Sequence, residues 1–109
     1  MNRIRVYISC AILATTGSVA ALAAGKGDAA KGKEVFSQCA VCHNADSTEK
    51  KMGPGLKGLF SHDKLVNGKK VTDATVREKI EEGGNGMPSY KDMLSDTEKD
   101  DLVAYLKTL

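Results

Sequence analysis

The stretch Cys39-Ala40-Val41-Cys42-His43 decides how the rest of this 109-residue sequence is interpreted. Two residues separate its cysteines, and a histidine directly follows the second one. The chain has one further cysteine, Cys10, and one further histidine, His62. Two of the three cysteines and one of the two histidines therefore lie within five consecutive residues.

The composition is that of one small globular domain with little apolar bulk. Hydrophobic residues make up 41% of the chain and charged residues 28%, whereas aromatic residues reach 5% and tryptophan is absent. A chain of this size generally needs a disulfide, a metal or a cofactor to hold its fold. The composition excludes a multidomain enzyme and a polytopic membrane protein.

Residues 1–23 have the pattern of a secretory signal peptide. Two arginines precede a run without charge over residues 6–24, and Ala21-Leu22-Ala23 follows the A-x-A cleavage pattern. The alternative is an uncleaved anchor, because 19 uncharged residues nearly span a bilayer. We expect cleavage, which leaves a mature domain over residues 24–109 without stable membrane insertion.

Loss of this segment changes the cysteine count and the charge. Cys10 leaves with it, so two cysteines enter a compartment that oxidises thiols, for which we expect the periplasm. The remaining 14 basic residues balance 14 acidic ones. A general nucleic-acid-binding surface is therefore not indicated.

The spacing of the motif is typical of c-type haem attachment, C-x-x-C-H. Each thiol adds to one vinyl group of a porphyrin, and two intervening residues let one turn of backbone reach both vinyls. The histidine then lies under the ring and binds iron on the proximal side. The motif predicts one haem c, attached covalently through Cys39 and Cys42, with His43 as an axial ligand.

Two other uses of these residues are weaker. A disulfide or thioredoxin-like redox pair belongs with a βαβ pattern, which the sequence lacks. A zinc site would combine the motif with His62, but adjacent cysteine and histidine ligands fit one tetrahedral ion poorly, and the spacing to His62 is unusual.

The chain resembles the class I (mono-haem) cytochromes c over residues 27–109. Five features carry the resemblance in order: a helix before the motif, the turn Gly53-Pro54-Gly55-Leu56, a middle helix, the Met87-Pro88 loop and a C-terminal helix. The resemblance implies an all-α cytochrome c fold, in which three main helices and loops wrap around one covalently bound haem.

The residues themselves favour the same helices. Asp28 is a good N-cap for a first helix that begins at Ala29. A middle helix is predicted from Thr72 or Asp73 to the break at Gly83.

The C-terminal helix has the strongest signals. Ser95 and Glu98 form a capping box. The resemblance implies that this helix meets the first one at Gly32 and Phe36. The apolar residues of the C-terminal helix recur at spacings of three and four. They form one stripe that consists of Leu102, Val103, Tyr105, Leu106 and Leu109.

The methionines and the remaining histidine are the candidates for the second axial ligand. Met87 lies in a glycine-rich loop with no apolar helix face to join, and a thioether ligates haem iron. In the family, the methionine of a Met-Pro pair after the middle helix is the distal ligand, so the resemblance implies Met87. The alternatives are Met52, Met93 and His62.

The resemblance implies two supporting roles. The Pro54 carbonyl accepts a hydrogen bond from the second ring nitrogen of His43 and orients the imidazole. Leu56 packs against the haem.

These ligands predict the function. With His43 and Met87 on the two faces of the haem, iron has no open position and cycles between ferrous and ferric. We therefore predict a one-electron carrier that is not an enzyme, and expect a monomer. The resemblance implies redox partners such as a quinol–cytochrome c reductase, a terminal oxidase or a periplasmic dehydrogenase.

Two alternatives for the function stay open. One is a haem subunit dedicated to a larger dehydrogenase or oxidase. The other is a ligand-binding haem sensor or enzyme with a labile distal site. For partner docking, the sequence offers a local lysine patch that consists of Lys50, Lys51, Lys57 and Lys91.

Overall fold

The computed structural model describes residues 27–109, so the signal segment expected at residues 1–23 lies outside the described residues. The described chain has helices and no strands, apart from two isolated β-bridges. The predicted all-α architecture is confirmed. The elements in order are α2 (Ala29–Phe36), the 3-10 helix η1 (Leu59–Ser61), α3 (Asp73–Glu82) and α4 (Asp96–Leu106).

The helices begin where side-chain caps satisfy their first N–H groups. The Asp28 carboxylate accepts hydrogen bonds from the N–H groups of Ala30 and Lys31, at 2.9 and 3.3 Å, which confirms the predicted cap of α2. Ser95 and Glu98 form the predicted capping box of α4, with distances of 3.0 and 3.1 Å.

The middle helix α3 also starts at a capping box. The Thr72 and Thr75 hydroxyls bind each other's backbone N–H groups, at 2.9 and 3.1 Å. The helix ends before Gly83, which has a φ of 66°. The predicted start and end of this helix are therefore confirmed.

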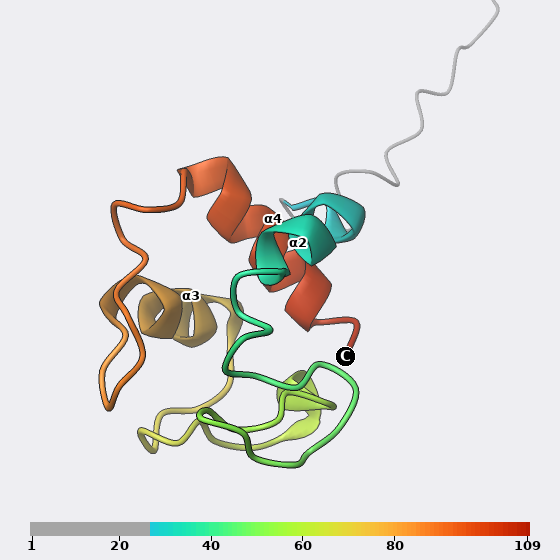
Figure 1. The fold of residues 1–109 in the computed structure, drawn as a ribbon, viewed down its shortest axis with the longest axis vertical. Helices are drawn as coiled ribbons and strands as arrows, with labels where there is room; N and C mark the ends of the chain where they lie inside the picture. The colour runs from blue at the N-terminus through green and yellow to red at the C-terminus, as the bar shows by residue number, and fades with distance from the viewer. Residues whose placement is uncertain (1–26) are drawn as a thin grey trace, which may run out of the picture.

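Helix α2 lies across α4 in close contact (Figure 1). A Cβ placed on Gly32 would lie 1.9 Å from the Asp101 carbonyl oxygen, so the helix backbones nearly touch there. The Phe36 and Tyr105 rings pack with centroids 5.3 Å apart. This confirms the contact of the two helices at Gly32 and Phe36. The Asp101 side chain adds a 2.8 Å hydrogen bond from the Asp28 N–H group.

The described core is small. Only Leu102 is fully buried among residues 27–109. Residues outside the α-helices, such as Leu56, Leu59, Phe60 and Met87, pack against this core but stay partly exposed. The polypeptide thus has an apolar lining that its own side chains do not cover. The buried hydrophobic residues are Phe36, Val76, Ile80, Tyr90, Leu94, Leu102, Val103 and Leu106.

The segment between α2 and α3, coloured green to yellow in Figure 1, lies below the helices as irregular loops around η1. None of the helices in residues 27–109 combines the length and the apolar character needed to cross a membrane.

The α2–α4 contact predicts a strong effect of Gly32→Ala. The added methyl group would meet backbone atoms of Asp101, which cannot move without separating the helices. We expect the free energy of unfolding to fall by about 2–3 kcal/mol, measured by chemical denaturation of the haem-loaded protein with circular dichroism. Lys33→Ala, on an exposed position of the same helix, should change it by less than about 0.5 kcal/mol. Equal stability of both variants would contradict the close contact.

Candidate functional site

The Cys39–His43 motif forms one helical turn that directly follows α2. The Cys39 N–H group binds the Phe36 carbonyl at 2.7 Å, and the His43 N–H group binds the Cys39 carbonyl at 2.9 Å. Both thiols are free and partly buried. Because the turn continues from α2, the packing of α2 on α4 also fixes where the thiols and the imidazole lie.

The His43 imidazole is held by the Gly53-Pro54 turn. Its Nδ1 lies 2.8 Å from the Pro54 carbonyl oxygen, which confirms the predicted contact. A carbonyl only accepts, so Nδ1 carries the ring proton and Nε2 has its lone pair free for a metal. A Cβ on Gly53 would lie 2.5 Å from Cε1 of the ring. Glycine is needed there because the ring packs directly against the backbone.

Backbone hydrogen bonds keep this turn in place. The Gly53 N–H group binds the Cys42 carbonyl at 2.8 Å, and the Leu56 N–H group binds the Asn44 carbonyl at 2.7 Å. Leu56 is partly buried and packs against the core. The turn that orients His43 is therefore built onto the motif itself.

The thiol of Cys39 sits in an apolar environment. Burial raises its pKa to about 11, and the neighbouring Cys42 adds to the rise. Burial also raises the pKa of Tyr90, with a further contribution from the charges of both cysteines. At neutral pH Cys39 and Tyr90 are therefore uncharged, as suits the lining of an apolar site.

Met87 follows a tight hairpin turn. Gly84 and Met87 exchange two backbone hydrogen bonds of 2.9 and 3.1 Å. The two residues between them, Asn85 and Gly86, have φ values of 53° and 91°. Positive φ at both central positions defines a type I′ turn, for which Asn-Gly is the preferred pair. This dipeptide is the sequence signal that would have predicted the turn.

The three alternatives to Met87 as the second axial ligand are exposed at the surface. Met52 is 79% exposed and Met93 is 65% exposed. His62 is exposed at the end of η1. Among the methionines of residues 27–109, Met87 alone packs against the core.

The two competing uses of the motif find little support in the described chain. The thiols of Cys39 and Cys42 are free and form no disulfide with each other. No three side chains of His, Cys, Asp or Glu in residues 27–109 come together as a metal site, so His62 does not complete a zinc site with the motif.

The residues do fit a covalently bound haem. Such a group requires two free thiols one turn apart, a histidine with a free ring nitrogen, and an apolar lining. The motif turn has free thiols, the Pro54 carbonyl leaves Nε2 of His43 available, and partly buried loop residues provide the lining.

Sequence relatives place the chain in a family. Residues 27–106 match the family described as "Cytochrome C oxidase, cbb3-type, subunit III". The chain is 33% identical over 97 residues to cytochrome c2 of Blastochloris viridis, covering 73% of this chain and 76% of that protein. The chain belongs to the class I c-type cytochromes. It is also 36% identical over 80 residues to cytochrome c6 of Synechocystis sp., covering 72% of this chain and 63% of that protein.

Solved structures confirm the cytochrome c fold. Cytochrome c6 from the diatom Phaeodactylum tricornutum superposes with a TM-score of 0.61 at 27% identity, covering 75% of this chain and 93% of that one. Cytochrome cH from Methylobacterium extorquens gives a TM-score of 0.57 at 28% identity, covering 76% and 100%. The chain is thus a c-type cytochrome with one haem c bound covalently through Cys39 and Cys42, and it is an electron carrier, not an enzyme.

The type I′ turn predicts the effect of substitutions at Gly86. Nothing lies within 4 Å of a Cβ placed there, so the cost of a side chain comes from its positive φ alone. Gly86→Ala should lower the free energy of unfolding by about 1 kcal/mol, and Gly86→Asn by less, because asparagine tolerates positive φ. Denaturation curves of the two variants give the comparison. An alanine variant as stable as the native protein would contradict this turn.

Proposed function

We propose that Nε2 of His43 and the sulfur of Met87 are the two axial ligands of the haem iron. The observation that carries this proposal is the 2.8 Å contact between Nδ1 of His43 and the Pro54 carbonyl, which leaves Nε2 free directly after the two thiols. Met87 is supported as the second ligand because it alone packs against the core among the methionines of residues 27–109.

The remaining site residues orient and shield the haem. Pro54 fixes the ring plane of His43 through its carbonyl oxygen, and a hydrogen bond at that nitrogen raises the basicity of the other. Leu56 packs against the haem and helps to exclude water. When bound, the haem supplies reversible one-electron chemistry at iron. The residues of this chain hold the ligand geometry constant between the two oxidation states.

Coordination of the haem iron by two protein ligands limits the reactions that the protein can carry out. A haem with protein ligands on both faces has no open position for a substrate or for oxygen. The protein therefore transfers single electrons between redox partners, as a carrier exported to the periplasm. The partner classes are a quinol–cytochrome c reductase, a terminal oxidase or a periplasmic dehydrogenase.

Four lysines are proposed as a local docking patch for these partners. The side chains of Lys50, Lys51, Lys57 and Lys91 are exposed. Lys51 also donates a 3.1 Å hydrogen bond to the Ala40 carbonyl, which joins the patch to the haem-binding motif. Exposed charges near the site of electron transfer act mainly on association rates.

A second candidate function is a subunit dedicated to one terminal oxidase. The match of residues 27–106 to the family of subunit III of cbb3-type oxidases favours it. Fractionation of native cells tests the choice. Recovery of the haem protein alone from the periplasm supports the carrier, whereas stable co-purification with an oxidase from membranes supports the subunit.

Axial ligation predicts distinct spectra for three methionine variants. The native protein should give the pyridine haemochrome spectrum of haem c and, in the ferric state, the red-region charge-transfer band of methionine ligation. Met87→Leu should lose this band, bind carbon monoxide in the ferrous state and show a lower potential, because a methionine ligand raises it. Met52→Leu and Met93→Leu are matched controls that should keep the band. Loss of the band in either control instead of Met87→Leu would overturn the ligand assignment.

The lysine patch predicts salt-dependent electron transfer. Lys57→Glu should slow oxidation of the ferrous protein by the anionic oxidant ferricyanide about threefold at low salt, with the difference shrinking as ionic strength rises. Stopped-flow rates at several salt concentrations measure this. Lys33→Glu, a matched charge reversal on α2, should have a smaller effect. A native oxidation rate that does not change with salt concentration would contradict the role of these lysines as a docking patch.

A further inference from the structure

A buried lysine of α4 reaches the Met87 loop. Lys99 is 5% exposed, although lysine is rarely buried without partners. Its Nζ donates a 2.8 Å hydrogen bond to the Lys91 carbonyl. Two carboxylates balance its charge, those of Glu81 at 3.5 Å and Asp96 at 3.8 Å. The shortest contact of this ammonium is thus with a backbone carbonyl of the loop.

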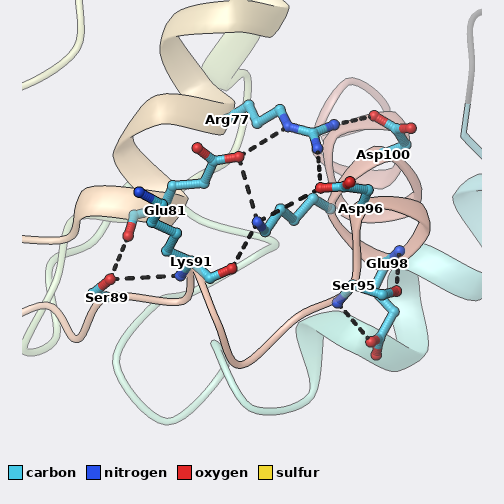
Figure 2. A network of polar contacts seen from close by, with 9 residues as sticks. Arg77, Glu81, Ser89, Lys91, Ser95, Asp96, Glu98 and Asp100 are labelled. Atoms are coloured by element: carbon cyan, nitrogen blue, oxygen red, sulfur yellow. Dashed lines mark hydrogen bonds and ion pairs between the residues drawn. The ribbon is translucent and has the colours of Figure 1, made fainter.

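Arg77 fixes the same carboxylates from α3. Figure 2 shows its guanidinium between Glu81, Asp96 and Asp100, with an Nε–Oε1 distance of 3.1 Å to Glu81 and 2.9 Å from a terminal nitrogen to Asp96. The hydrogen bond from Arg77 to the Glu81 carboxylate lowers the pKa of Glu81. The carboxylates that face Lys99 are therefore held in place by a second cation.

The loop over residues 83–93, which carries Met87, is otherwise tied to α3. The Tyr90 N–H group binds the Ile80 carbonyl at 3.0 Å, and the Ser89 hydroxyl binds the Glu81 carbonyl (Figure 2). Within the described residues, the bond from Lys99 to Lys91 is the one hydrogen bond that ties this loop to α4.

We propose that Lys99 is a positioning residue for Met87, because its ammonium holds the carbonyl of Lys91 and so fixes the limb of the loop that returns from Met87 to α4. This inference rests on the proposed function, in which Met87 is a ligand of the haem iron. The bonds of Ser89 and Tyr90 attach this limb to α3, and the bond of Lys91 attaches the same limb to α4, so both helices hold the segment that follows Met87.

An apolar side chain in place of Lys99 would still fill space, but it would release the loop. Methionine keeps a similar length and lacks donors, so Lys99→Met removes the bond to Lys91 and leaves the Met87 side chain unchanged. A loosened loop lets an added ligand displace Met87 from iron more easily. The imidazole affinity of the ferric protein reports on this displacement directly and does not depend on electron-transfer activity.

The test is imidazole titration of the ferric protein, followed by loss of the red-region charge-transfer band. Lys99→Met should bind imidazole about tenfold more tightly than the native protein, which is the factor expected when one hydrogen bond to a charged group is lost. Lys99→Arg keeps a cationic donor and should restore an affinity close to the native one. Should Lys99→Met not accumulate with haem, Lys99→Gln, which keeps a polar end, provides the same comparison with an intermediate increase.

Two controls separate positioning from general stability. Lys107→Met removes the same charge at the C-cap of α4 but breaks only a pair with Asp73 and a contact with the Phe60 ring. Thr72→Ala removes a bond of the capping box at the start of α3, at the opposite end of that helix from the Met87 loop. Both should bind imidazole with about the native affinity, even where unfolding measurements show lower stability.

The imidazole titration and the charge-transfer band test two separate claims, the positioning role of Lys99 and the assignment of Met87 as a ligand. Native affinity in Lys99→Met, or an equal increase in Thr72→Ala, would overturn the positioning role while leaving Met87 as the ligand. Absence of the charge-transfer band in the native protein would instead overturn the ligand assignment itself, and with it the proposed function.

Discussion

The backbone contact between α2 and α4 at Gly32 is the constraint on which the rest of the structure depends. The haem-binding turn continues directly from α2, so its thiols and imidazole stand where that helix is placed. The Met87 loop ends at the start of the same α4. The crossing of α2 and α4 therefore fixes the position of the haem-binding turn relative to the Met87 loop, although these two parts of the site are far apart in the sequence. A side chain at Gly32 would disturb both halves together.

The haem completes a core that the polypeptide alone leaves thin. Few side chains of the described residues are wholly buried, and the loops present partly exposed apolar groups to the core. Burial of such groups drives folding in proportion to the area removed from water. Stability and redox function are thus linked in this chain, because the group that transfers the electron also covers the apolar lining. The network of Arg77 and Lys99 adds a polar attachment that the apolar contacts do not provide.

Local chemistry explains why much of this was predictable. Asp28, Ser95 and Glu98 cap helices through contacts with residues nearby in the chain, so their roles can be derived from the sequence. The Pro54 contact followed from the family resemblance and is present. No pattern in the sequence predicts the roles of Lys99 and Arg77, because charged residues on a helix normally face water. The burial of Lys99 and the ion pairs of both cations depend on how α3 approaches α4, which no local pattern encodes.

Haem attachment and helix capping act over a few neighbouring residues, so the haem-binding motif, the three helices and the methionine in a glycine-rich loop can be predicted from local sequence. The packing of distant segments determines which ring nitrogen of His43 stays free, which methionine packs inward and which lysine is buried. Each of these depends on contacts between segments distant in the chain. Such contacts form only when α2, α3 and α4 pack together, so their partners are selected by the shape of the whole domain.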